Sequence, residues 1–396
     1  MNSSNTVQQP YRMSWIILLA SLTALGPLSI DMYLSALPEM AADFGVSTQM
    51  VANSLPAYFL GLALGQLIYG PISDRVGRKP PLYFGLCLYI VASVLCIFAQ
   101  NEWSLIAARI LQALGGCVGV VMVRAAIRDR LDMQSAAQAF ASMMIVTSIA
   151  PIVAPSLGAW VLIFYDWHMI FVVLMMSGLF MLACVHFLFE ETLKPEQQLK
   201  LNFQQVLSLY RAIFQDESFR HPMLVGCLSG GIMFSYISAS SAIFMDRYQL
   251  SEQQFAYAFG VNAMGIMLSS ALNKHLVGRF TIRGRLQLGL WLQALGVSAL
   301  LIMGLLDTQS VIPVLVALFL VVAAVGFTGP NAMALAMSEQ GARAGTASAI
   351  IGSMQFTCGL LGGVLLNFLL WNALLNMALV MTLLVCIAIW MQFKLA

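Results

Sequence analysis

Two ionisable residues, Asp31 and Arg109, lie inside apolar stretches long enough to cross a membrane. Such groups are costly to place in a bilayer and mark functional sites. Each lies about 6 residues from the same end of its stretch, or roughly 9 Å below one membrane surface at about 1.5 Å per residue. Burial favours a protonated carboxyl group, whereas a nearby guanidinium favours the carboxylate. We therefore expect Asp31 to carry protons and Arg109 to be a fixed cation at the same depth; a structural ion pair is the alternative.

The composition excludes several classes of protein. Of the 396 residues, 60% are hydrophobic and 9% are charged, whereas about 25% are charged in a soluble domain. Soluble enzymes and nucleic-acid-binding proteins are therefore excluded, and the net charge of +2 indicates no polyanionic partner. The seven cysteines form no CxxC pair and the four histidines form no HExxH motif, so we expect no metal, no cofactor and no enzymatic activity.

Apolar stretches of spanning length occur twelve times, six on each side of one polar segment. They lie at 14–37, 48–70, 81–99, 103–127, 135–164, 167–189, 222–245, 255–276, 284–306, 311–337, 343–369 and 371–393. This pattern predicts an all-α integral membrane protein with 12 transmembrane helices in two six-helix bundles, residues 1–189 and 222–396. In the linker between them, 190–221, apolar residues recur at helical spacing and predict an amphipathic helix on the membrane surface. They are Phe203, Val206, Leu207, Tyr210, Ile213 and Phe214.

The basic residues indicate an orientation in the membrane. If the N-terminus is cytoplasmic, 17 of the 19 Lys and Arg residues fall in cytoplasmic segments, as the positive-inside rule requires. The other two are Arg109 and Arg247. We therefore expect both termini and the linker to be cytoplasmic.

The most specific motif is the short loop Gly70-Pro71-Ile72-Ser73-Asp74-Arg75-Val76-Gly77-Arg78-Lys79. Glycines permit a tight turn, an aspartate can cap a helix, and the cations favour the anionic inner surface of the membrane. One interpretation is an ordinary basic loop. The string nevertheless resembles the signature loop of the major facilitator superfamily.

Further strings are similar to those of the drug–proton antiporters of the Bcr/CflA (bicyclomycin-resistance) family. They are Asp31-Met-Tyr-Leu-Ser-Ala-Leu-Pro38, Arg109-Ile-Leu-Gln-Ala-Leu-Gly115-Gly116, Arg124-Ala-Ala-Ile-Arg128-Asp129 and Ala150-Pro151-Ile-Val-Ala-Pro155-Ser-Leu-Gly158-Ala159. The chain departs from the family pattern at Ser35, Ala159 and His168, which bears on packing more than on function.

The resemblance implies a major facilitator fold and proton-coupled multidrug efflux by alternating access. Amphenicols or drugs of the bicyclomycin type are the implied substrates, and the inner membrane of a bacterium is the implied location. We expect the drug, protons and the lipid bilayer as partners, no nucleic acid, and a monomeric transporter. Two other functions stay open, uptake by a symporter and export of a native metabolite.

The candidate site residues form three groups. Those for the substrate pocket, besides Asp31 and Arg109, are Tyr33, Tyr58, Gln112, Tyr236, Asn262, Asn331 and Gln355. Those for a charge latch that holds the outward-facing state are Gly70, Asp74, Arg75, Gly77, Arg78, Arg124, Arg128 and Asp129. The motif of the fifth helix comprises Pro151, Pro155 and Gly158. In the family that the chain resembles, the bend that the prolines cause in this helix is associated with export. Core packing or a solvated loop is the alternative interpretation of each group.

Overall fold

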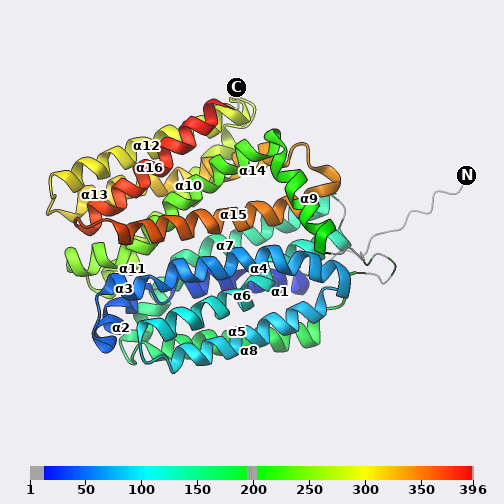
Figure 1. Cartoon of the computed structure of the whole chain (residues 1–396), viewed down its shortest axis with the longest axis horizontal. Helices are drawn as coiled ribbons and strands as arrows, with labels where there is room; N and C mark the ends of the chain where they lie inside the picture. The colour runs from blue at the N-terminus through cyan, green and yellow to red at the C-terminus, as the bar shows by residue number, and fades with distance from the viewer. Residues whose placement is uncertain (1–12, 132, 194–195, 197, 199–202, 395–396) are drawn as a thin grey trace, which may run out of the picture.

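The structure is a computed structural model that describes residues 13–131, 133–193, 196, 198 and 203–394. In this part of the chain the long elements are helices that run side by side (Figure 1). Eleven helical segments among the described residues are long and apolar enough to cross a membrane, and the described apolar part of α7 (Met133–Leu162) is shorter, Ile149–Leu162. Together they correspond to the twelve predicted spans, so the all-α membrane fold is confirmed.

The elements of the first half are α1 (Met13–Asp31), η1 (Leu34–Ala36), α2 (Leu37–Phe44), α3 (Thr48–Ala52), α4 (Ser54–Val76), α5 (Lys79–Ile97), α6 (Glu102–Arg130), α7 and α8 (His168–Leu188). After α9 (Phe203–Gln215) come α10 (Glu217–Ser241), η3 (Ala242–Arg247), α11 (Glu252–His275), α12 (Ile282–Leu305), α13 (Val311–Ala323), α14 (Val325–Met337), η4 (Gly341–Arg343), α15 (Ala344–Leu365), η5 (Leu366–Phe368) and α16 (Ala373–Phe393).

Two predicted spans are interrupted. The span 14–37 is not one helix, because α1 ends at Asp31 and the chain continues through η1 into α2, whose first turn contains Pro38. Proline favours the first turn of a helix because its missing N–H would have no partner there. The tenth span likewise divides at Ala324 into α13 and α14. Asp31 therefore lies at a helix end rather than inside a continuous helix.

We call the end of the molecule with α9 the linker end and the end with α2 and α3 the far end (Figure 1). The loops α4–α5, α6–α7 and α11–α12 lie at the linker end, since each follows a helix that starts at the far end. The basic residues of these loops are therefore gathered at that end. That the linker end is cytoplasmic stays a prediction.

Two seams join the first half to the second, α4 against α15 and α7 against α11. Figure 1 shows these helices in the middle of the molecule, with α5 and α8 on one side and α12 and α16 on the other. Within the first half, α6 packs against α1, α4 and α5. A capping box starts α6: Asn101 accepts from the Ser104 N–H at 2.9 Å, and the Ser104 hydroxyl accepts from the Asn101 N–H at 3.2 Å. Arg109, two turns further along, thus lies in the centre of the first half.

The predicted amphipathic helix of the linker is α9. It packs against α10 and α15, with Ile213 fully buried, while Leu207 is 57% exposed. The Tyr210 hydroxyl donates to the backbone carbonyl of Leu67 in α4 at 3.0 Å. The apolar face of α9 is thus partly used to join the two halves, and its place on the membrane surface stays a prediction.

Candidate functional site

The Arg109 guanidinium is fully buried in the first half. Its Nη1 donates to Gln112 Oε1 at 2.5 Å, and its Nη2 donates to the backbone carbonyl of Ser29 at 2.8 Å. The guanidinium carbon lies 4.1 Å from the ring centre of Tyr58 and 4.3 Å from that of Tyr33, and cation–π contacts are strongest away from water. Among the described residues, the Arg109 Nε and the Tyr58 hydroxyl have no hydrogen-bond partner.

Hydrogen bonds from α6 through α5 to α1 hold this arrangement. Gln112 Nε2 donates to the Ser93 hydroxyl at 2.8 Å, and that hydroxyl donates to the carbonyl of Tyr89 at 2.7 Å. The hydroxyls of Tyr89 and Ser29 share a hydrogen bond of 2.7 Å. Ser29, Ser93 and Tyr89 were not among the predicted site residues. Their hydroxyl groups within apolar spans were the feature of the sequence that could have identified them. The network gives Arg109 a fixed position without a carboxylate.

Asp31 is also buried, with 4% of its surface exposed. Residues two apart on a helix differ by about 200° in direction, so Asp31 projects away from the face on which Ser29 meets Arg109. Within the described part of the chain its side chain makes no hydrogen bond or salt bridge, and it lies within electrostatic range of Tyr236 in α10. Asp31 and Arg109 therefore do not form the structural ion pair that was the alternative interpretation.

Tyr236 and Asn262 of the second half lie together. Asn262 Nδ2 donates to the Tyr236 hydroxyl at 2.9 Å, which leaves the hydroxyl proton available for another acceptor. The Tyr236 ring stacks on Phe259 at 5.6 Å between ring centres, and both polar residues are 2% exposed. Two predicted pocket residues thus meet within the second half, and Tyr236 is in electrostatic range of Asp31.

The motif of the fifth helix packs against the chain segment that follows Asp31. Gly158 lies directly on the backbone carbonyl of Met32, with no room for a side chain. One turn earlier, the carbonyl of Pro155 accepts a hydrogen bond from the Ser35 hydroxyl at 3.5 Å. Pro151 and Pro155 both lie inside α7. The motif therefore helps to place Asp31, a contact that the sequence analysis did not predict.

Two candidate pocket residues lie elsewhere. Asn331 Nδ2 donates to Asn273 Oδ1 at 3.0 Å, and the same oxygen accepts from Arg285 Nη1 at 3.0 Å. These residues form a buried cluster near the linker end of the second half, away from Asp31. Gln355 on α15 packs against Gly230 of α10 inside the second half. The sequence could not predict these positions, since depth in a span does not give the direction in which a side chain points.

Several predicted latch residues meet around Arg78, which is 1% exposed. Its Nη1 donates to Asp74 at 2.6 Å and to the Ser73 hydroxyl at 2.7 Å, and its Nε and Nη2 donate to Asp129 at 2.8 and 3.2 Å. Burial alone would lower the pKa of Arg78, but the hydrogen bonds to the two carboxylates raise it above its ordinary value. This part of the latch lies entirely within the first half.

Two arginines of the latch reach the second half. Arg124 Nη1 donates to the Ser348 hydroxyl of α15 at 3.2 Å. Arg128 is 3.7 Å from Asp74, and its guanidinium fills the space beside Gly345 at the start of α15, where a side chain would clash. In contrast, Arg75 is exposed, and Gly70 has open space where a side chain would be.

The sequence analysis missed Glu191, which binds the start of α5. Four backbone N–H groups donate to its carboxylate at 2.9 to 3.0 Å: those of Arg78, Lys79, Thr192 and Leu193. Burial would raise the pKa of Glu191, but these donors hold it below its ordinary value. Gly77, with φ of 95°, allows this approach, since a side chain there would meet the carboxylate. The signal in the sequence was an acidic residue directly after the sixth span.

Described residues of the two halves are in contact at three levels of their boundary. At the far end, Gln49 donates to Asn367 at 3.3 Å and Asn367 donates to Asn53 at 2.6 Å. In the middle, Phe59 of α4 packs on Phe234 of α10, with 4.5 Å between ring centres. Towards the linker end, the side chain of Gln66 fills the space beside Gly352, in addition to the arginine contacts. The halves are therefore joined by side-chain contacts towards both ends.

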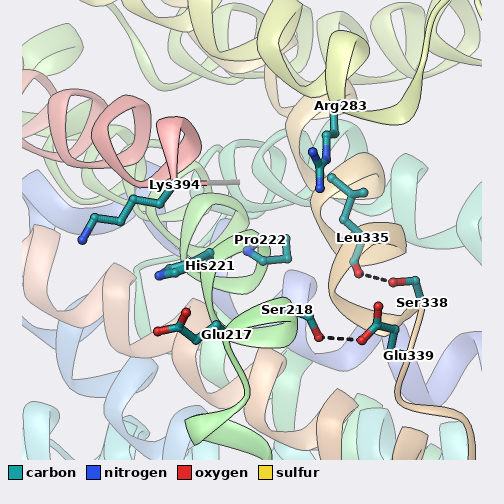
Figure 2. A pocket seen from close by; sticks show the side chains of 9 residues that line it. All are labelled: Glu217, Ser218, His221, Pro222, Arg283, Leu335, Ser338, Glu339 and Lys394. Carbon is teal, nitrogen blue, oxygen red and sulfur yellow. Dashed lines mark hydrogen bonds between the residues drawn. The ribbon is translucent and has the colours of Figure 1, made fainter. Parts of the chain in front are cut away.

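Figure 2 shows a cavity of about 240 Å³ at the linker end of the second half. Arg283 points into it from α12, and the Ser218 hydroxyl donates to Glu339 at 3.0 Å across one side. No predicted pocket residue lines this cavity, and its walls belong to the second half alone. It is therefore not a passage between the halves.

Comparisons with known proteins agree with this architecture. The family model described as Major Facilitator Superfamily matches residues 19–363. The chain is 33% identical over 356 residues to "Uncharacterized MFS-type transporter YdgK" of Bacillus subtilis, covering 88% of this chain and 87% of that one. It is 29% identical to "Bicyclomycin resistance protein homolog" of Haemophilus influenzae, with 90% of each covered. It is 28% identical to "Multidrug resistance protein MdtL" of Escherichia coli, with 86% and 84% covered.

A solved structure supports the fold. The structure of a D-xylose-proton symporter superposes with a TM-score of 0.73 and 16% identity, covering 96% of this chain and 97% of that one. The predictions of a multi-pass membrane transporter, and not an enzyme, are thereby confirmed. With its sequence relatives of the drug-resistance type, the chain belongs to the major facilitator superfamily.

Proposed function

We propose that this transporter exports small-molecule drugs of the bicyclomycin or amphenicol type in exchange for protons, with Asp31 as the proton carrier. The observation that carries the proposal is the environment of Asp31. Its carboxyl group is buried, has no partner among the described residues, and lies within electrostatic range of Tyr236 in the other half. A buried carboxylate without a partner is strongly disfavoured, so in this form of the protein we expect Asp31 to hold its proton.

In the proposed exchange of drug for protons, the surroundings of Asp31 change when the two halves move apart. When the halves part at the linker end, water reaches Asp31, and the carboxyl group can release its proton as a drug binds. When they part at the far end, a proton from that side neutralises Asp31 and displaces the drug. Arg109 stays charged throughout, and its unbonded Nε and the Tyr58 hydroxyl are donors for a polar group of the substrate.

The remaining assignments belong to the same proposal. The two halves, residues 1–189 and 222–396, act as the two moving bodies, and the arginines near α15 act as the latch between them. Both termini face the cytoplasm, the location is the inner membrane of a bacterium, and the transporter works as a monomer. The drug-resistance names of two relatives support the substrate class, and the linker-end concentration of basic residues supports the orientation.

Everted membrane vesicles with an imposed proton gradient test the proposal. An exporter accumulates drug inside such vesicles, and Asp31→Asn should reduce this accumulation to background because the amide cannot carry a proton. Asp166→Asn is the matched control, since Asp166 lies in the exposed α7–α8 loop. Both variants should reach wild-type amounts in the membrane. Proton-driven accumulation that persists in Asp31→Asn would exclude Asp31 as the carrier.

The same vesicles distinguish efflux from uptake. A symporter would accumulate its substrate in right-side-out vesicles with an inward proton gradient and would not concentrate drug in everted ones. A panel of bicyclomycin, chloramphenicol and a sugar in both vesicle types therefore separates the two functions. Concentration of the sugar alone in right-side-out vesicles would overturn the proposed drug export.

A further inference from the structure

A cavity of about 510 Å³ opens at the far end, where the two halves meet. Its walls come from α3 and the residues that flank it in the first half, and from the end of α10, η3, η5 and the start of α16 in the second. Ala239 lines it, one helical turn after Tyr236 on α10. The cavity therefore lies directly beyond the Asp31–Tyr236 site along α10.

A thin barrier separates the cavity from that site. Pro56 of α4 packs against Gly363 of α15 so closely that a side chain at Gly363 would clash with it and lie 3.2 Å from the Ser238 hydroxyl. Ser238 stands between Tyr236 and Ala239, and its hydroxyl has no hydrogen-bond partner among the described residues. A substrate released when the halves part here would enter the cavity next.

One carboxylate supplies the charge of the cavity. Asp246 is the charged residue in its lining, and in the described part of the chain it has no salt bridge. The neighbouring Arg247 forms a salt bridge with Asp307 at 2.7 Å. Thr48, from the first half, lines the cavity together with Asp246. The cavity is thus a negatively charged site without a counter-ion.

An aromatic wall faces this charge from the second half. Trp371 lines the cavity and is 62% exposed. Its backbone is fixed by Asn376, which accepts from the Trp371 N–H at 3.2 Å and donates to the Trp371 carbonyl at 3.1 Å. Tryptophan is the best aromatic partner for a cation. Amides of Gln49, Asn53 and Asn367 supply further polar groups.

We propose that this far-end cavity is a second binding site, which takes organic cations with an apolar body on their way out. The unpaired Asp246 would balance the cationic centre and Trp371 would cover the apolar part. A neutral ligand would leave the carboxylate unpaired, which is why the site selects cations. The direction of travel rests on the proposed efflux, but binding at this site does not.

Equilibrium binding of radiolabelled tetraphenylphosphonium to the full chain in lipid nanodiscs, without a proton gradient, tests the site. The side chain of Asp246 is exposed, so loss of its charge in Asp246→Asn should weaken binding about fivefold, with no change in the control Asp166→Asn. Trp371→Leu should weaken it several-fold, whereas Trp103→Leu, at an exposed tryptophan of the far end that does not line the cavity, should not. Neutral triphenylphosphine oxide should bind weakly, and equally to the wild type and Asp246→Asn.

The central site is distinguished by Asp31→Asn, which should leave tetraphenylphosphonium binding within about twofold of the wild type. Unchanged binding in Asp246→Asn, or loss of binding in Asp31→Asn alone, would overturn the proposal and place the cation in the centre. Gel filtration and melting temperature check that each variant is folded. If Asp246→Asn does not fold, the comparison of Trp371→Leu with Trp103→Leu decides in the same way. Failure of efflux in vesicles would leave these binding results standing.

Discussion

Replacing Gly158 by alanine should disable transport by displacing the end of α1. The added Cβ would overlap the backbone carbonyl oxygen of Met32, which cannot swing aside as a side chain can. To make room, α1 and α7 must separate by about 1 Å or more, and such overpacking costs about 1–3 kcal/mol of folding free energy. Met32 follows Asp31 directly, so the same shift moves the carboxyl group relative to Tyr236.

The expected functional loss is larger than the loss of stability. A misplacement of about 1 Å in a positioned group costs on the order of 100-fold in rate. We therefore expect proton-driven drug accumulation in everted vesicles to fall at least about tenfold in Gly158→Ala, because part of the misplacement will relax. The melting temperature of the purified protein should fall as well.

Gly26→Ala is the matched control, since nothing lies within 4 Å of a Cβ added at this position of α1. This substitution should leave transport unchanged and can stabilise the helix by up to about 1 kcal/mol. Wild-type accumulation in Gly158→Ala, measured at equal protein amounts, would show that the contact with Met32 does not position Asp31.

Three further substitutions test the other parts of the site. Arg109→Lys should abolish drug accumulation, because an ammonium cannot keep two hydrogen bonds and two ring contacts at once; wild-type accumulation would contradict this. Glu191→Ala should lower thermal stability by about 0.5–2 kcal/mol at neutral pH. The pKa of Glu191 is lower in the folded protein than its ordinary 4.5. The difference in stability between the wild type and Glu191→Ala should therefore vanish as the pH falls below 4.5 and through the folded pKa. Melting curves that show the same difference at every pH would refute the role of the Glu191 carboxylate as an acceptor for the N–H groups of α5. Asn331→Ala should lower the melting temperature, because Asn273 loses the hydrogen bond from Asn331. Drug affinity in a binding assay should stay unchanged. Weaker drug binding would show that Asn331 belongs to the substrate pocket.

The fold could be predicted from the sequence because its main determinant is local. A span needs about 20 apolar residues, so twelve spans and the polar linker are visible without knowledge of any contact. The breaks after Asp31 and at Ala324 were not visible, since a helix interrupted by a short turn keeps the same apolarity. The end of α4 also differs from the predicted end at residue 70. The helix continues through Asp74 to Val76, because Arg78 binds Ser73 and Asp74 in its last turns.

The burial of Asp31 and Arg109 could be predicted from the sequence, but the direction of their side chains could not. Both residues are buried, yet a difference of two residues on α1 turns Asp31 away from the bound carbonyl of Ser29. For the same reason the sequence could not predict that Asn331 lies with Asn273 and Arg285. Glu191 was missed because its role depends on a contact with α5, more than a hundred residues earlier, and no local pattern records such a contact.

In the function that we propose, the separation of Asp31 from Arg109 lets one carboxyl group serve as a switch. In a direct salt bridge the guanidinium would favour the carboxylate in every conformation, and the proton would rarely return. Arg109 is instead held by Gln112, Ser29 and two tyrosine rings of its own half. In the proposed cycle it therefore keeps its place while the groups of the second half move relative to Asp31. The proposal thus links proton uptake and release to the motion that opens one end or the other, as obligatory exchange requires.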